Sequence, residues 1–143
     1  MLEVKGIENG IVLDHITAGN GIKVFNKLFS AQTDYPVVLV MNVESGLLSR
    51  KDIIKIENHF DVNLQVLGLI DENITVNVIE NGHLIEKKKV SIPQRISGLF
   101  DCENPRCITN HDDHCPADFE LVSKNGALEY ACTFCEEITK FTL

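Results

Sequence analysis

The chain has 143 residues, of which 44% are hydrophobic and 24% are charged, and its net charge is −8 at pH 7. These values are ordinary for a globular protein and allow one domain or two small ones. Nine acidic and three basic residues from Asp101 onward give that part a charge of −6 and leave −2 for the rest. An acidic module is a poor match for a phosphate backbone, so the composition argues against nucleic-acid binding.

The N-terminal residues predict neither a secretory leader nor a membrane anchor. Glu3 and Glu8 occur where a leader would have basic residues followed by an apolar core. The longest apolar run, residues 37–41, is far too short to cross a bilayer. We therefore expect a cytoplasmic protein without membrane contact, and in a reducing compartment cysteine pairs favour a metal over a disulfide.

The N-terminal part of the chain predicts strands around one helix. Residues 11–16 suit a strand, and the preceding apolar positions, Leu2, Val4 and Ile7, suit another that ends at Asn9-Gly10. Asn20 is placed to cap a helix. The apolar face of this helix comprises Ile22, Phe25, Leu28 and Phe29. The continuous apolar run 37–43 then predicts a central strand.

The following residues predict a second helix, a strand and a hairpin. Ser49 is placed to cap the helix, whose apolar positions are Ile53, Ile56 and Phe60. Residues 64–70 form an apolar run typical of a strand, and 74–79 and 84–90 flank the turn dipeptide Asn81-Gly82. We expect an α+β fold, a ferredoxin-like antiparallel sheet with two helices.

Pro93 interrupts this pattern, and residues 92–99 are expected to form a short connector. Beyond the connector lies a cysteine-rich module with strand candidates at 119–122 and 128–131. The predicted domains are residues 1–94 and 95–143, the second a small zinc-ribbon-like β domain.

Four cysteines in the second domain have the spacing of a tetrahedral metal site. Cys102 and Cys107 form C-x4-C, and Cys132 and Cys135 form C-x2-C, so each tight turn supplies two ligands. Zinc suits four thiolates best, although iron fits the same shape, and four reduced buried cysteines are the structural alternative. Such a site holds a fold together and leaves no open position for catalysis. The nearby Cys115, His111 and His114 either decorate the loop or form a second ligand set.

Polar residues of the first domain allow a structural or a ligand-binding interpretation. Asp14-His15 is either a strand-end pair in which the carboxylate fixes the imidazole, or a ligand-facing edge. The lysines Lys51, Lys55 and 87–89 either form solvated surfaces or converge on an anion. An enzyme with Asp14 and His15 as an acid/base pair lacks partner residues, and no other catalytic arrangement stands out.

Motifs along the chain resemble the regulatory chain of aspartate carbamoyltransferase, a non-catalytic subunit in pyrimidine biosynthesis. The resemblance covers residues 2–141 and rests on LDHI at 13–16, RKDIIKIEN at 50–58, ITVNVIEN at 74–81, IPQRI at 92–96 and the two cysteine pairs. The alternative function is that of a zinc-ribbon nucleic-acid-binding protein.

The resemblance implies an N-terminal allosteric domain that binds CTP and UTP as inhibitors and ATP as an activator. By motif position, Asp14 and Lys55 hold the ribose, while His15, Asn77 and Lys87 face the triphosphate beside Leu84. The residues implied around the base are Val4, Lys5, Gly6, Ile7 and Ile79. Two positions depart from the family, because Lys5 stands where an acidic residue is common and Gly82 where an aromatic one is.

The resemblance also implies partners and a cofactor for the second domain. One structural Zn²⁺ per chain, on Cys102, Cys107, Cys132 and Cys135, holds a domain that docks onto the catalytic chain. The allosteric domains are expected to pair into a regulatory dimer.

Overall fold

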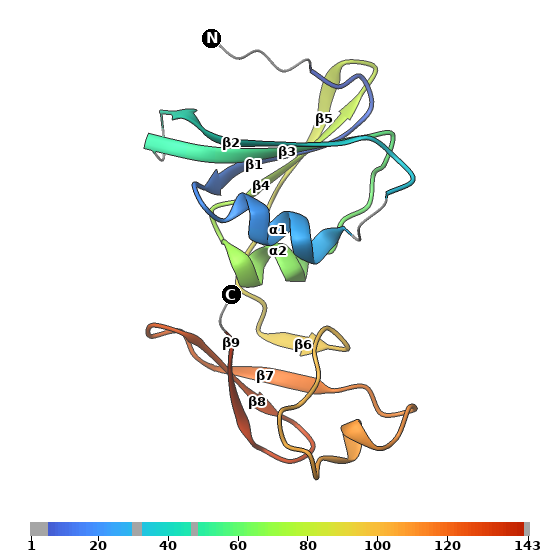
Figure 1. The fold of residues 1–143 in the computed structure, drawn as a ribbon, viewed down its shortest axis with the longest axis vertical. Coiled ribbons are helices and arrows are strands. Elements are labelled where there is room, and N and C mark those ends of the chain that lie inside the picture. The colour runs from blue at the N-terminus through green and yellow to red at the C-terminus, as the bar shows by residue number, and fades with distance from the viewer. Residues whose placement is uncertain (1–5, 30–32, 47–48, 142–143) are drawn as a thin grey trace. The chain divides into compact units, whose positions relative to one another are not determined.

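A computed structural model describes residues 6–29, 33–46 and 49–141 of the chain. The chain divides into two compact units, Met1–Ile92 and Pro93–Leu143 (Figure 1). The expected strand at residues 2–7 lies mostly outside the described residues. No helix in the described ranges combines the length and apolarity needed to span a membrane.

The first unit is an antiparallel sheet with two helices on one face (Figure 1). Its elements are β1 (Gly10–Thr17), α1 (Gly21–Leu28), β2 (Val37–Ser45), β3 (Ser49–Glu57), α2 (Leu64–Ile70), β4 (Thr75–Glu80) and β5 (His83–Lys89). The strand order is β2-β3-β1-β4-β5, so the strand predicted at residues 37–43 is confirmed but lies at an edge of the sheet and not at its centre. The first four strands and two helices follow the βαββαβ ferredoxin-like pattern, and β5 extends one edge through a hairpin. The predicted α+β fold is therefore confirmed.

The hydrophobic core lies between the sheet and the helices. Alternate residues of β1, β3 and β4 point to this side and are buried together with side chains of both helices. The fully buried members are Ile11, Leu13, Ile16, Val24, Ile54, Ile56, Leu67, Ile74 and Val76. The opposite side of the sheet, which we call the outer face, carries the intervening residues.

Two predicted elements were assigned the wrong type. Residues 49–57 form strand β3 rather than a helix, and Asp52, Ile54 and Ile56 are buried with the two-residue period of a strand. Residues 64–70 form helix α2 rather than a strand. Asn63 begins this helix, because its side chain accepts hydrogen bonds from the backbone N–H groups of Gln65 and Val66.

The start of α1 depends on Asp52 and not on a side-chain cap from Asn20. Asp52 Oδ2 accepts from Gly19 N at 3.0 Å and Gly21 N at 2.9 Å, while Oδ1 accepts from Asn42 N at 2.8 Å. A Cβ on Gly21 would lie 2.7 Å from Asp52 Cβ, so a glycine is required there. This buried carboxylate ties β3 to α1 and β2.

The second unit is a four-stranded antiparallel sheet of order β6-β7-β8-β9. Its elements are β6 (Arg95–Ser97), the 3₁₀ helix η1 (Ile108–Asn110), β7 (Asp118–Ser123), β8 (Leu128–Cys132) and β9 (Ile138–Phe141). The strands predicted at 119–122 and 128–131 are confirmed as β7 and β8; β6 lies in the predicted connector, and β9 was not predicted. The rings of Phe100 and Phe119 are stacked with their centroids 4.5 Å apart. Tyr130 Oη donates a hydrogen bond to Pro93 O at 2.7 Å. Phe119 is also the cross-strand partner of Cys132, so the aromatic core adjoins one of the cysteines.

Candidate functional site

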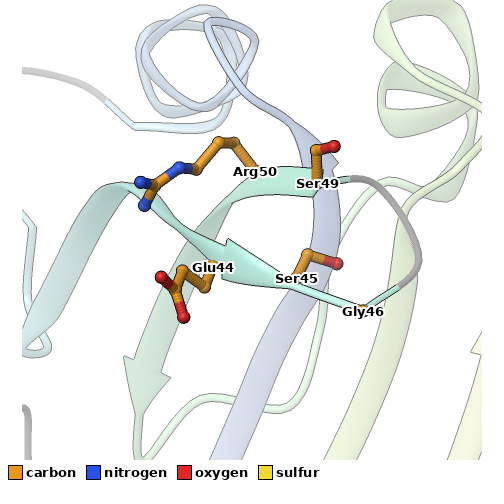
Figure 2. A pocket seen from close by; sticks show the side chains of 5 residues that line it. All are labelled: Glu44, Ser45, Gly46, Ser49 and Arg50. Carbon is orange, nitrogen blue, oxygen red and sulfur yellow. The ribbon is translucent and has the colours of Figure 1, made fainter.

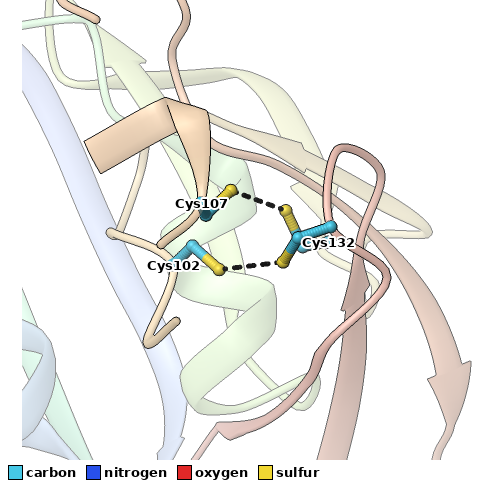
Figure 3. A group of neighbouring side chains, drawn as sticks. Cys102, Cys107 and Cys132 are labelled. Atoms are coloured by element: carbon cyan, nitrogen blue, oxygen red, sulfur yellow. Dashed lines mark hydrogen bonds between the residues drawn. The ribbon is translucent and has the colours of Figure 1, made fainter. Parts of the chain in front are cut away.

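The four predicted cysteines come together in the second unit. Their sulfur atoms all lie within 4.8 Å of one another, with Cys102–Cys135 at 3.6 Å and Cys107–Cys132 at 3.7 Å (Figure 3). Zinc–sulfur bonds of about 2.3 Å in a tetrahedron place the sulfurs about 3.8 Å apart. The spacing therefore fits four ligands of one metal ion, and the domain is a metal-binding domain.

Two turns present these sulfurs. Cys102 and Cys107 lie in the loop between β6 and η1, where Asn110 Nδ2 donates to Cys102 O and Asn104 O at 2.9 and 2.7 Å. Cys132 ends β8, and the chain turns back so that Glu136 N donates to Cys132 O at 2.8 Å. The loops are therefore held by backbone and amide contacts as well as by the sulfurs.

The four thiols need a cation if all of them are to be deprotonated. Burial raises the pKa of Cys102 to about 12 and also raises the pKa of Cys132. The hydrogen bond from Thr109 lowers the pKa of Cys107 to about 7. Four adjacent thiolates repel one another, so the positive charge of a metal ion is needed to hold them deprotonated.

Two of the three other candidate ligands of this module, Cys115 and His111, have side-chain contacts of their own. Cys115 Sγ lies 3.8 Å from Asp112 Oδ2, and His111 Nε2 lies 2.6 Å from Pro105 O. The backbone N–H of His114 donates to Asp112 Oδ1 at 2.9 Å. Cys115 lines a hollow of about 290 Å³ and is not one of the four grouped sulfurs. Among the described residues, one four-cysteine metal group is thus present.

On the first unit, predicted ligand-binding residues form rows across the outer face. Lys55, Val12, Asn77 and Lys87 are direct cross-strand partners on β3, β1, β4 and β5. Neighbouring Cβ atoms in such a row are about 5 Å apart, so the two lysines flank Val12 and Asn77 with about 15 Å between their Cβ atoms. Asn77 Oδ1 is buried and has no hydrogen-bond partner among the described residues. The row thus combines two cations with an unsatisfied acceptor.

Asp14 and His15 occupy a β-bulge next to this row. β1 pairs Leu13 with Ile54 but Ile16 with Asp52, so β1 contains one extra residue here, and His15 has a φ of 58°. Asp14 Oδ1 accepts from the backbone N–H of His15 at 2.7 Å, whereas His15 Nδ1 lies 2.9 Å from Thr75 Oγ1. The interpretation that the carboxylate fixes the imidazole is therefore wrong, because Thr75 holds the ring.

Lys51 forms an ion pair with Asp14 that the sequence did not predict. Its Nζ lies 2.8 Å from Asp14 Oδ1. Burial raises the pKa of Asp14, but the hydrogen bonds from Lys51 and His15 outweigh it and leave the pKa below its usual value. The pairing depends on the register between β1 and β3, which residue order alone did not give.

Of the remaining predicted residues, Ile79 and Leu84 lie in the row that follows the lysine row on β4 and β5. Ile79 pairs with Gly10 and Leu84, and Gly6 and Ile7 precede β1. Val4 and Lys5 lie outside the described residues. A separate hollow of about 510 Å³ occurs at the β2–β3 hairpin, beside Glu44 and Arg50 (Figure 2), and none of the predicted ligand residues that the structure describes lines it.

Comparison with known proteins covers both units. Residues 2–91 match the family model of the aspartate carbamoyltransferase regulatory chain, allosteric domain, and residues 94–142 match that of its metal binding domain. The aspartate carbamoyltransferase regulatory chain of Clostridium botulinum strain Hall is 49% identical over 96% of this chain and 94% of its own length. Those of Clostridium acetobutylicum and Bifidobacterium longum are 44% and 40% identical, over 98% and 97% of this chain and 95% and 99% of their own lengths. The chain therefore belongs to the family of aspartate carbamoyltransferase regulatory chains, which are non-catalytic subunits with an allosteric and a metal-binding domain.

Proposed function

We propose that the outer face of the allosteric domain binds nucleoside triphosphates, with CTP and UTP inhibiting and ATP activating the partner enzyme. The observation that carries this proposal is the cross-strand row of Lys55, Asn77 and Lys87. A triphosphate needs several cations and donors, and ammonium groups are suited to phosphate oxygens.

The neighbouring residues supply complementary chemistry for the rest of the nucleotide. Asp14 accepts a hydrogen bond from a ribose hydroxyl, Lys55 donates one to a ribose oxygen, and His15 faces the phosphates. Asn77 also faces the phosphates, and its amide Nδ2 can donate to a phosphate oxygen. Ile79 and Leu84 give an apolar surface next to the row, where backbone groups of Gly6 and Ile7 frame the base.

The metal-binding domain is proposed to hold one Zn²⁺ and to dock onto the catalytic chain. Ile108, which follows Cys107, and Phe134, which lies between Cys132 and Cys135, are 50% and 49% exposed. Apolar side chains next to the ligands form a surface that exists only while the metal holds both turns. Loss of the metal is therefore expected to abolish docking as well as local folding.

A second copy of the chain is proposed to pair with the allosteric domain. Strands β2 and β5 are the outermost strands of the described sheet, and edge strands are templates for further pairing. Nucleotide binding would then bias two states of the assembly by a coupling free energy of about 1–3 kcal/mol.

Binding of CTP and ATP to the metal-loaded chain, measured by calorimetry, tests the nucleotide site. Lys87→Ala is expected to weaken CTP binding about fivefold, as for an exposed ion pair of about 1 kcal/mol, and to leave cytidine binding unchanged. Lys124→Ala, an exposed lysine of the other unit, is the matched control. Equal losses for CTP and cytidine would contradict the role of Lys87.

The regulatory role needs the partner enzyme. The chain is mixed with a cognate catalytic trimer, and aspartate carbamoyltransferase activity is measured with each nucleotide before and after chelation. Activity that does not respond to any nucleotide in an assembled complex would refute regulation, and assembly that persists after the metal is removed would refute docking through the metal-binding domain.

A further inference from the structure

Glu8 lies at the end of the outer face, beside the β4–β5 turn. Its carbonyl oxygen accepts from Gly82 N at 2.9 Å. A Cβ built on Gly82 would lie 3.8 and 4.0 Å from the two carboxylate oxygens of Glu8. Gly82 has a φ of 78° and no side chain, so the turn leaves this exposed carboxylate uncovered.

One apolar row of the outer face separates Glu8 from the lysine row. Glu8 lies before β1, four residues before Val12. The row between them contains Gly10, Ile79 and Leu84. Along this line the outer face changes from ammonium groups to a flat apolar surface and then to a carboxylate.

We propose that Glu8 selects the base of the bound nucleotide by accepting a hydrogen bond from an exocyclic amino group. The inference rests on the proposed nucleotide site, with the ribose at Lys55, the triphosphate at Lys87 and the base over Ile79. An ionised carboxylate only accepts hydrogen bonds. Cytosine offers an amino donor where uracil offers a carbonyl oxygen, and adenine differs from hypoxanthine in the same way. Glu8 therefore favours CTP over UTP and ATP over ITP.

Calorimetry on the metal-loaded full chain tests this selection with matched pairs of nucleotides. A hydrogen bond to a charged group gives about tenfold discrimination, so the unmodified chain is expected to bind CTP about ten times more tightly than UTP. Glu8→Ala is expected to bring the two affinities within about twofold, mainly by weakening CTP. Glu8→Gln, which keeps an acceptor oxygen, is expected to retain part of the preference.

Glu80→Gln is the control for general charge effects. Glu80 is exposed on the same hairpin but follows Ile79, so it points to the other side of β4. Removing this charge is expected to change CTP and UTP binding equally. ATP and ITP give an independent pair, and far-ultraviolet circular dichroism checks that each variant is folded.

The outcomes separate the two hypotheses. If the unmodified chain binds none of the four nucleotides, the proposed function and this inference both fail. If it binds them but Glu8→Ala leaves the CTP:UTP and ATP:ITP ratios unchanged, the nucleotide site stands and the role of Glu8 is refuted. A loss of preference that Glu80→Gln reproduces also refutes it.

Discussion

Asp52→Ala is expected to destabilise the allosteric domain more than any loss of an exposed carboxylate. Asp52 is 1% exposed and accepts hydrogen bonds from three backbone N–H groups, those of Gly19, Gly21 and Asn42. The alanine would remove the acceptor of all three donors, which come from the start of α1 and from the bulge of β2. A buried donor that loses its acceptor retains the full cost of its desolvation.

The expected magnitude follows from the burial of each donor. Gly21 is buried, so its unsatisfied N–H costs about 2 kcal/mol, whereas Gly19 and Asn42 are exposed residues whose N–H groups can bind water and cost about 0.5–1 kcal/mol each. The total loss is about 3–4 kcal/mol, a large part of the roughly 5–15 kcal/mol that stabilises an ordinary domain. Asp52→Asn should lose slightly less, because one amide oxygen still accepts.

Two measurements check this expectation. Urea unfolding of the metal-loaded chain, followed by circular dichroism, gives the change in the free energy of unfolding, with Asp61→Ala at an exposed position as the control. Amide hydrogen exchange should accelerate selectively at Gly19, Gly21 and Asn42. A loss below about 1 kcal/mol with unchanged exchange at these amides would refute the reasoning.

Three further predictions concern single residues. Cys107→Ser should lose the metal and unfold the second unit, while Cys115→Ser should retain both, as measured by elemental analysis and circular dichroism. Burial raises the pKa of Tyr130 from 10.0 to about 12, so its contribution to stability is complete below about pH 10 and is lost as the pH rises through about 12. Tyr130→Phe should remove this alkaline loss in unfolding curves, and an unchanged pH dependence would contradict it. His15 has a φ of 58°, so His15→Val should cost about 1–2 kcal/mol and His15→Asn much less in urea unfolding; equal losses would show that the backbone is not the cause.

The fold class could be predicted from the sequence although two elements were not. Residues 49–57 contain apolar residues at both helical and strand spacings, and the β-branched isoleucines at 53, 54 and 56 were the better signal for a strand. Residues 64–70 are a short apolar run, and periodicity alone cannot assign such a run to a helix or to a strand. The missed signal was Asn63, a good N-cap residue directly before that run.

The four metal-binding cysteines could be predicted from the sequence alone, whereas the arrangement of the proposed nucleotide-binding residues could not. The cysteine spacing predicts its own geometry, because each pair lies within one turn of the chain. Lys55, Asn77 and Lys87 lie on three different strands, so their residue types alone did not predict that they share one row. Only the family resemblance grouped them as ligand-binding residues. The contacts of Lys51 with Asp14 and of Asp52 with α1 depend on strand register and bulges, which no local pattern specifies.

The bulge at His15 changes the outer face of β1 without changing which of its side chains are buried in the core. Leu13 and Ile16 both point into the core, so a strand with one residue fewer between them would keep the same hydrophobic alternation. The extra residue is therefore unnecessary for the interior and affects only what the opposite side presents. A chain from which His15 is deleted is expected to fold around an intact interior while its surface no longer carries a carboxylate and an imidazole side by side. Such a shortened chain would separate folding from ligand recognition more cleanly than a side-chain replacement.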